Sequence, residues 1–184
     1  EGTKASGAEV RIGDAVNPDD INIFRQLAGG VTTIQQLHGS ANPIGGQSSI
    51  IKLRWGQPAR GLKFEGAPGF IKFALGENVK QSNWGDRETV RYPQTRMGIE
   101  QVFYDHFLRA REYDQKWQSL KSAEEQPFWK KILKKKQKES KPNLRVDLGL
   151  EALAEILNHK RFITCHSYVQ SEINMLMHVG DSLN

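Results

Sequence analysis

The order of apolar and polar positions divides the chain into helical and extended segments. Residues 17–30 predict a helix that Asn17 caps and that Gly29 and Gly30 end. Its expected apolar face consists of Ile21, Phe24, Leu27 and Ala28. The β-branched run at 31–37 follows directly and predicts a strand, so these two segments form a helix-to-strand unit.

Further elements follow from the same patterns. Strands are expected at 49–55, 69–78 and 161–166, and helices at 98–121, 128–141, 147–158 and 171–183. Residues 38–49 have the Gly, Pro, Ser and Asn content of a long irregular loop. Only about a dozen residues separate 49–55 from 69–78, which is few for the usual crossover helix. We therefore expect 49–55 to belong to a hairpin or to a segment that leaves the main sheet, and not to a main parallel strand. The overall order predicts an α/β protein with a parallel sheet.

The composition is that of an ordinary globular protein. The chain has 184 residues, 38% of them apolar, which suffices for one core or at most two small ones. It has no run of the ~18 uncharged apolar residues that a membrane-spanning helix needs. A single cysteine, Cys165, excludes an intrachain disulfide framework and a multi-cysteine zinc site. The first residues lack the pattern of a signal peptide, and nothing indicates a compartment.

Positive charge is concentrated in one segment. The net charge is +5, and residues 128–141 hold seven lysines and one glutamate, which leaves the rest of the chain slightly negative. A nucleic-acid partner is not expected, because such proteins usually spread arginine and aromatic residues over a basic face. Two interpretations of the segment stay open. It is a solvated helical face, or the chain is a non-catalytic binding module whose Lys-rich helix 130–141 docks an acidic partner.

Candidate chemistry gathers where predicted strands end, since functional groups of parallel α/β proteins lie at carboxyl ends of strands. His166 could bind a metal there, or cap the helix that follows. Cys165 alternates to the other face of its strand, where a buried apolar thiol is expected and a nucleophile is the alternative. Glu77 could be a metal ligand, a general base or merely solvated. Lys72 lies inside an apolar strand, where a lysine must be paired, shifted in pKa or modified.

Four strings resemble the metal-dependent amidohydrolase superfamily, in its imidazolonepropionase- and prolidase-like branch. They are GGVTTIQQLHGSANPIGGQSSIIK (29–52), FIKFALGENVK (70–80), YPQTRMGIEQVF (92–103) and FITCHSYVQSEI (162–173). The resemblance implies a (β/α)8 barrel in which one or two divalent metal ions, with zinc expected, activate water against an amide-type C–N bond. It implies a small-molecule amide or dipeptide-like substrate and is compatible with a homo-oligomer.

The resemblance also assigns residues. His166 corresponds to a histidine metal ligand at a central strand end, and the bridging ligand falls at Lys72, which would have to be carbamylated, or at Glu77. Glu77 is slightly favoured because it lies nearer the expected strand end. The residues expected to bind substrate are His38, Gly45, Gly46 and Tyr168.

The departures from the family pattern are equally informative. The His-x-His motif of the first strand, the next histidine and the late aspartate are absent, and a complete barrel needs ~250 residues. We therefore expect residues 1–184 to be the central part of an amidohydrolase barrel domain, a partial (β/α)8 TIM barrel with a mostly helical insertion at about 79–146. This chain alone should be nearly inactive. Strands 69–75 and 161–166 should end at one edge of a parallel sheet, with His166 and Glu77 facing one cleft that holds no tightly bound metal.

Overall fold

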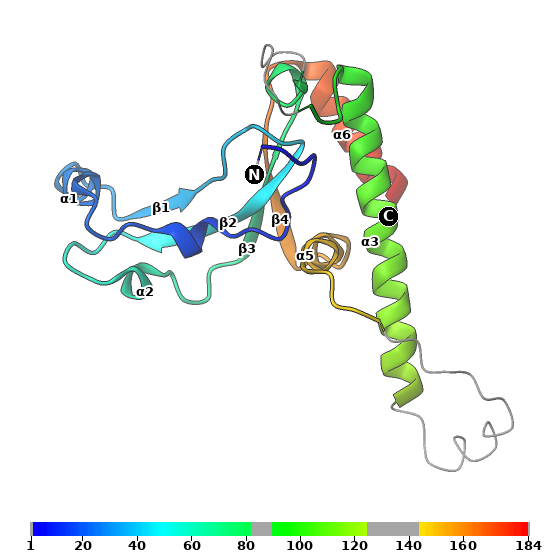
Figure 1. Ribbon diagram of the computed structural model, residues 1–184. Coiled ribbons are helices and arrows are strands. Elements are labelled where there is room, and N and C mark those ends of the chain that lie inside the picture. The colour runs from blue at the N-terminus through cyan, green and yellow to red at the C-terminus, as the bar shows by residue number, and fades with distance from the viewer. Residues whose placement is uncertain (1, 82–89, 125–143, 184) are drawn as a thin grey trace, which may run out of the picture.

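A four-stranded sheet forms the centre of the protein. The computed structural model describes residues 2–81, 90–124 and 144–183 (Figure 1). The strands are β1 (Thr33–Gln36), β2 (Ile44–Lys52), β3 (Gly69–Ala74) and β4 (Arg161–His166), and they lie in the order β1-β2-β3-β4. The Lys-rich segments 128–141 and 130–141 fall outside the described residues, so their helical structure stays a prediction.

The sheet is mixed, and the prediction of a parallel sheet is correct only for its last pair. β1 with β2 and β2 with β3 pair antiparallel, whereas β3 and β4 pair parallel from Gly69 with Arg161 to Ala74 with His166. The connection 37–43 is too short for a helical crossover, so β1 and β2 must be antiparallel. The connection 53–68 contains only the four-residue helix α2 (Ala59–Leu62), and it returns the chain antiparallel from β2 to β3. As expected, 49–55 does not form a main parallel strand, because β2 pairs antiparallel on both sides.

Helices cover one face of the sheet. They are α3 (Arg96–Glu124), α5 (Leu148–Leu157) and α6 (Gln170–Leu183). The shorter helices lie elsewhere and are η1 (Ile12–Ala15), α1 (Ile21–Ala28), α2 (Ala59–Leu62) and η2 (Gly76–Asn78). The ring centroid of Phe73 on β3 lies 5.3 Å from that of Phe103 and 6.0 Å from that of Phe107 on α3. These rings, together with Ile71, Leu153 and Val179, belong to the main hydrophobic core.

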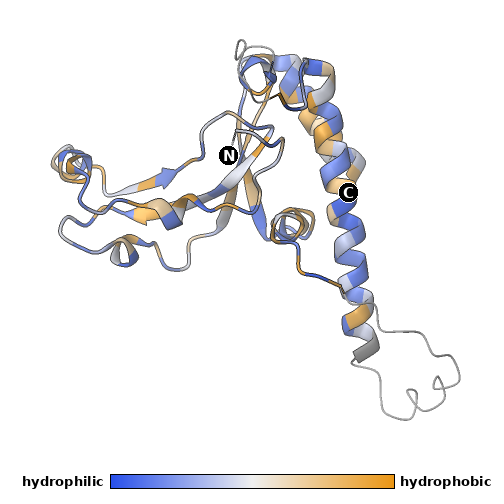
Figure 2. Cartoon of the chain, in the orientation of Figure 1, coloured by the Kyte–Doolittle hydropathy of each residue, from blue (hydrophilic) through white to orange (hydrophobic). Residues whose placement is uncertain are grey.

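The two halves of α3 differ. Ile99, Val102, Phe103, Phe107 and Ala110 are buried in the main core, whereas residues 111–122 include no buried position. Figure 2 shows the part of α3 farther from the sheet as predominantly hydrophilic. The first half therefore packs as a crossover helix of the α/β layer. The boundaries of an insertion at 79–146 stay a prediction.

A smaller second core lies in an arm formed by η1, α1, α2, β1 and the far half of β2 (Figure 1). Its buried members are Ile23, Ile51, Leu53 and Leu62. The predicted apolar face of the first helix is correct only in part. Leu27 packs against this core as predicted, but Ile23 is buried while Ile21 and Phe24 remain about half exposed. The helix also begins later than predicted, since Asp20, not Asn17, accepts the capping bond from the Asn22 amide at 2.9 Å.

The predicted loop 38–49 is shorter than expected, because β2 already begins at Ile44. A Gly- and Ser-rich stretch can form a strand when neighbours on both sides satisfy its backbone, and β2 lies between β1 and β3. In α6 (Gln170–Leu183), contact residues were predicted at Ile173, Leu176 and Met177. Leu176 packs against the main core as predicted, but Ile173 and Met177 are exposed, and Glu172, Val179 and Leu183 are buried instead.

The uncovered face of the sheet is concave. Lys72 on β3 and Thr164 on β4 are register partners, so both side chains point to the same face. Gln35 on β1 donates from Nε2 to Thr164 Oγ1 at 3.2 Å. Three strand spacings of ~4.8 Å would separate β1 from β4 in a flat sheet, so this contact requires strong curling. Within the described ranges, no helix has the length and apolarity needed to cross a membrane.

Candidate functional site

The candidate site lies where β3 and β4 end side by side. The parallel register pairs Ala74 with His166, and the Leu75 amide continues it with a bond to the His166 carbonyl at 2.9 Å. The two strand ends therefore lie on one edge of a parallel pair, as the sequence predicted. The segments after them, η2 and residues 167–169, form the rim of the site together with the loop 37–43.

Three side chains from separate segments meet at this edge. Lys72 Nζ donates to Ser40 Oγ at 2.8 Å, and Ser40 Oγ lies 2.7 Å from His166 Nδ1. Lys72 Nζ also lies 3.4 Å from the His38 carbonyl oxygen. Because the Ser40 oxygen accepts from the lysine, its own proton is available for donation to His166 Nδ1. Asn78 Nδ2, at 3.4 Å from the same nitrogen, is a second donor.

Burial changes the charge balance of Lys72. The residue is 7% exposed, and loss of water lowers the pKa of its ammonium group, while the nearby Cys165 thiol acts in the opposite direction. Among the described residues, the side-chain partner of this ammonium group is the neutral hydroxyl of Ser40. A neutral amine is thus more accessible here than on a solvated lysine.

Cys165 differs from the prediction of a buried thiol. The residue is exposed, with Sγ 3.7 Å from the His166 carbonyl oxygen. The protein around the sulfur nevertheless removes enough water to raise its pKa from 9.0 to about 11, an effect that Lys72 reduces and Glu172 increases. The thiol is therefore protonated at neutral pH and is a poor nucleophile.

His38 packs on the two glycines of β2. A Cβ atom on Gly45 would lie 2.7 Å from the Lys72 carbonyl oxygen and 3.3 Å from His38 Nδ1. A Cβ atom on Gly46 would lie 2.8 Å from Val10 Cγ2 and 3.0 Å from His38 Cδ2. Both glycines are buried, so in the folded chain they make room for this imidazole. Whether they or His38 also bind substrate stays a prediction.

The loop that carries Ser40 is fixed from both sides. Asn42 Nδ2 donates to the Lys4 carbonyl oxygen at 2.5 Å, and the buried Arg91 guanidinium donates to the Ala41 carbonyl oxygen. Arg91 also binds the Val79 carbonyl oxygen at 3.2 Å, just after η2. These contacts hold the Ser40 loop against the segment that carries Asn78.

Tyr168 lies at the mouth of the site. Its ring stacks edge-on against His166 with centroids 4.6 Å apart and an interplanar angle of 70°, and the residue is 70% exposed. A phenol in this position can contact a molecule that approaches His166 from solvent. Its predicted role in substrate binding remains a prediction.

The Glu77 side chain forms ion pairs away from Ser40 and His166. Its carboxylate lies 2.7 Å from Lys80 Nζ and 2.9 Å from Arg96 Nε. Arg96 Nε is also 3.5 Å from Glu172 Oε1, so one arginine joins two carboxylates from η2 and α6. The structure thus brings Lys72, and not Glu77, into contact with the Ser40–His166 pair.

Three residues of this region were not anticipated from sequence. Ser40 and Asn78 bind His166, and Glu172 is a buried carboxylate at the start of α6. Glu172 Oε2 lies 3.4 Å from Ser167 Oγ, and the carboxylate lies so close to Gly76 that a Cβ there would be 2.6 Å from Oε2. The sequence contained one indication of Ser40 and Asn78. Ser40 lies in the loop after the predicted strand 31–37, and Asn78 lies at the end of the predicted strand segment 69–78.

The donor set is incomplete for a metal site by itself. Across the described segments, no group of three or more His, Cys, Asp and Glu side chains is arranged to hold a metal ion. Structural and catalytic zinc sites use at least three protein ligands. Lys72 and His166 could supply two donors, the lysine only as a carbamate, because an ammonium group cannot bind a cation.

Comparison with known proteins gives one informative similarity. No family pattern matches the chain, and no curated protein matches it. Among solved structures, the crystal structure of an amidohydrolase from Thermotoga maritima MSB8 superposes with a TM-score of 0.76 at 31% sequence identity. The match covers 100% of this chain and 42% of that protein, so the chain spans less than half of its length. This similarity supports a relationship to the amidohydrolase superfamily.

Proposed function

We propose that this chain is part of a metal-dependent amidohydrolase in which Lys72 and His166 belong to the metal shell. The observation that carries the proposal is the convergence of Lys72 Nζ and His166 Nδ1 on one oxygen, Ser40 Oγ, at 2.8 and 2.7 Å. The two residues come from adjacent parallel strands and lie near their carboxyl ends, where α/β enzymes place catalytic groups. The similarity to a solved amidohydrolase supports the amidohydrolase part of this proposal.

The residues present fit part of a metal site. His166 Nδ1 lies 2.7 Å from Ser40 Oγ, and in the tautomer that leaves this nitrogen unprotonated its lone pair faces Ser40. The lowered pKa of Lys72 favours the neutral amine, the form that combines with carbon dioxide to give a carbamate. A carbamate would replace the ammonium by two oxygen donors. We therefore propose Lys72, in place of Glu77, as the bridging ligand, since Glu77 is already paired with Lys80 and Arg96.

A divalent ion, with zinc expected, would supply a water molecule acidified for attack on an amide carbon. The residues of this chain would position the metal-binding imidazole and the substrate. Ser40 and Asn78 fix the imidazole of His166, and Tyr168 offers an exposed aromatic face beside it. Substrates of this site would be small amides or dipeptide-like molecules that contact Tyr168 and His38 at the rim.

The architecture proposed for the complete enzyme is a (β/α)8 barrel of which this chain forms a part. Two features support it. β3 and β4 pair parallel, and α3 and α5 lie between them in sequence as a helical crossover, whereas the antiparallel β1 and β2 would lie outside the ring of parallel strands. Lys72 and Thr164 would then point into the barrel, where side chains of such enzymes lie.

The test is cobalt binding to the 184-residue chain in bicarbonate buffer. Cobalt(II) absorption reports the ligand environment, and NMR with 13C-bicarbonate reports a carbamate carbon. We expect weak binding that Lys72→Ala and His166→Ala abolish, while Glu77→Ala retains it. The carbamate signal should vanish in Lys72→Ala and persist in Lys80→Ala, the matched control. Loss of binding in Glu77→Ala alone would transfer the bridging role to Glu77, and binding that none of these variants changes would refute the site.

A further inference from the structure

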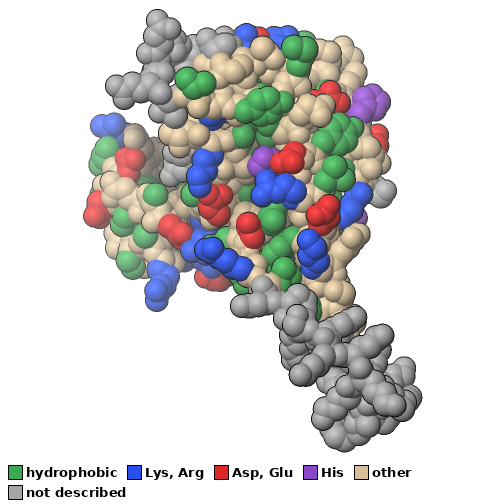
Figure 3. Space-filling model, turned by 45° about the vertical axis from the view of Figure 1, so that its right-hand side comes forward, with side chains coloured by type: hydrophobic (Ala, Val, Ile, Leu, Met, Phe, Trp, Pro, Cys, Tyr) green, Lys and Arg blue, Asp and Glu red, His purple; other side chains and the backbone are tan. Residues whose placement is uncertain are grey.

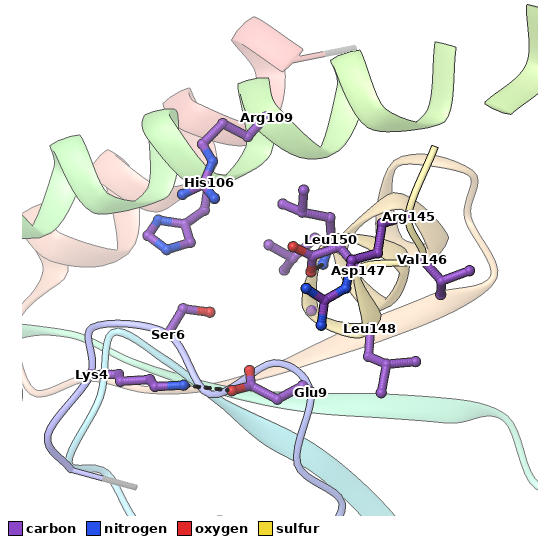
Figure 4. A pocket seen from close by; sticks show the side chains of 12 residues that line it. Lys4, Ser6, Glu9, His106, Arg109, Arg145, Val146, Asp147, Leu148 and Leu150 are labelled. Atoms are coloured by element: carbon purple, nitrogen blue, oxygen red, sulfur yellow. Dashed lines mark hydrogen bonds and ion pairs between the residues drawn. The ribbon is translucent and has the colours of Figure 1, made fainter. Parts of the chain in front are cut away.

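A cavity of about 580 Å³ lies away from the strand ends, between the N-terminal segment, the middle of α3 and the start of α5 (Figure 4). Lys72, Ser40 and His166 do not line it. Charged side chains of both signs are interspersed with apolar ones on the face of the molecule that α3 occupies (Figure 3). The cavity therefore requires an explanation separate from that of the candidate site.

The acidic groups of the cavity already have partners. Glu9 Oε1 lies 3.3 Å from Lys4 Nζ, and Asp147 Oδ1 accepts from the Leu150 amide at 2.9 Å as the N-cap of α5. The start of α5 is thus capped by the protein's own carboxylate and offers no free anion site.

The arginines of the cavity are less satisfied. Arg145 has no ion-pair or hydrogen-bond partner in the part of the chain that the structure describes. Arg109 has one long contact, at 3.4 Å to Asp105 on its own helix, and both groups there are more than half exposed. Contacts of this kind contribute little, so both guanidinium groups can take an external carboxylate at small cost.

Two further features complete the cavity. His106 Nδ1 binds the Val102 carbonyl oxygen at 2.8 Å, which leaves Nε2 on the side of the ring that faces Ser6 (Figure 4). Beside these polar groups, Val146 and Leu148 are 49% and 61% exposed. Apolar side chains this exposed, next to guanidinium groups with few or weak contacts among the described residues, favour a ligand with an apolar body and one anionic end.

We propose that this cavity binds a small monocarboxylate with an apolar body, its carboxylate held by Arg109 and Arg145 and its body against Val146 and Leu148. Guanidinium and carboxylate groups match in a planar, two-bond geometry. Glu9 and Asp147 line the same cavity and disfavour a doubly charged anion such as hydrogen phosphate. This site is independent of the metal chemistry proposed above.

The experiment is an NMR titration of the full 184-residue chain with hexanoate, hexanol and inorganic phosphate as separate probes. Hexanoate should shift the amides of Ser6, His106 and Gly149, while hexanol and phosphate bind at least tenfold more weakly. Arg145→Ala and Arg109→Ala should each weaken hexanoate binding about tenfold, the effect of losing one charge-assisted hydrogen bond. Arg25→Ala, a matched exposed arginine on α1, should change the affinity less than twofold.

Each alternative result would overturn the proposal. Equal binding of hexanol would show an apolar patch without carboxylate recognition. Phosphate binding of equal strength would show a general anion site. Hexanoate affinity that neither arginine variant changes would place the ligand elsewhere. Both arginines are exposed, so a thermal unfolding curve of each variant should match that of the parent chain.

Discussion

The hydroxyl group of Ser40 joins a buried lysine to a histidine of the neighbouring strand. Its oxygen accepts from Lys72 at 2.8 Å and lies 2.7 Å from His166 Nδ1. A hydrogen bond to a charged group stabilises a fold by roughly 1.5–3 kcal/mol, and removal of one partner leaves the other buried and unsatisfied. Much of the local order at this edge therefore depends on one small side chain.

Replacement of Ser40 by alanine should lower the free energy of unfolding by about 1–3 kcal/mol, because Lys72 then lacks its side-chain acceptor. Ser48→Ala is the matched control. The Ser48 hydroxyl is buried and has no hydrogen-bond partner within the described residues, so its loss should change stability by less than about 0.5 kcal/mol. Urea unfolding monitored by circular dichroism measures both, and equal effects would contradict the bridging role of Ser40.

The thiol of Cys165 should be slow to react in the folded chain. Its pKa of about 11, against 9.0 for a free thiol, leaves about a hundredfold less thiolate at any pH well below 9. Iodoacetamide alkylation followed by mass spectrometry should be slower by about this factor than in urea, and Lys72→Met should slow it further. By linkage, this raised pKa contributes stability below pH 9 that is lost as the pH rises toward 11. Equal rates in the folded and unfolded chain would contradict the assignment.

At the scale of elements, the sequence pattern was a good guide to two of the later segments. The segment 161–166 is β4 to the residue, and the helix expected at 147–158 is α5 at Leu148–Leu157. The helix expected at 17–30 is α1 at Ile21–Ala28, but its buried face was predicted only in part. The helix is short and has apolar residues on several sides, and the arm core buries Ile23 together with the predicted Leu27. β2 was mistaken for a loop up to Ser49, since glycine composition cannot show that His38 and Val10 will pack on Gly45 and Gly46.

The site was predictable only in part. The rule that functional groups lie near strand ends identified Lys72 and His166, and the parallel pairing of β3 and β4 confirmed that these strand ends share an edge. The contact through Ser40 was not predictable, because a loop hydroxyl has no characteristic spacing in sequence. The ion pair that turns the Glu77 carboxylate toward Arg96 could not be predicted from sequence either, because Arg96 follows Glu77 only after the segment 82–89.

The turn after β3 provides a test at this scale. Gly76 has φ +68°, and a Cβ there would lie 2.6 Å from the buried Glu172 carboxylate, whereas Gly66 has φ +77° with nothing within 4 Å. Gly66→Ala should therefore cost about 1 kcal/mol of conformational strain. Gly76→Ala should cost about 1–3 kcal/mol more, because Glu172 must move. Thermal unfolding of the two variants compares them, and equal losses would show that Glu172 yields without cost.

The whole molecule contains two hydrophobic cores that β2 connects. Residues near the start of β2 pair with β3 over the main core, and those near its end pair with β1 over the arm core. The arm core contains few buried side chains, so its local free energy of opening should be the smaller of the two.

Leu62→Ala should therefore destabilise the arm locally, since the fully buried Leu62 belongs to its small core. Hydrogen exchange measured by mass spectrometry should accelerate in α1, β1 and α2 and remain unchanged in β3, β4 and the first half of α3. Phe73→Ala, in the main core, should cost about 3–5 kcal/mol and accelerate exchange throughout the body. Uniform acceleration in Leu62→Ala would show that the two cores open as one unit.

The parallel pairing of β3 with β4 has a consequence for the order of folding. Gly69 pairs with Arg161, so roughly ninety residues must be looped out before this contact forms, whereas β1 and β2 meet across a short connection. Contacts between distant parts of a chain form slowly, and local hairpins form within microseconds. The arm should thus be ordered early, and the strand edge that joins Lys72 to His166 should be assembled in one of the last steps.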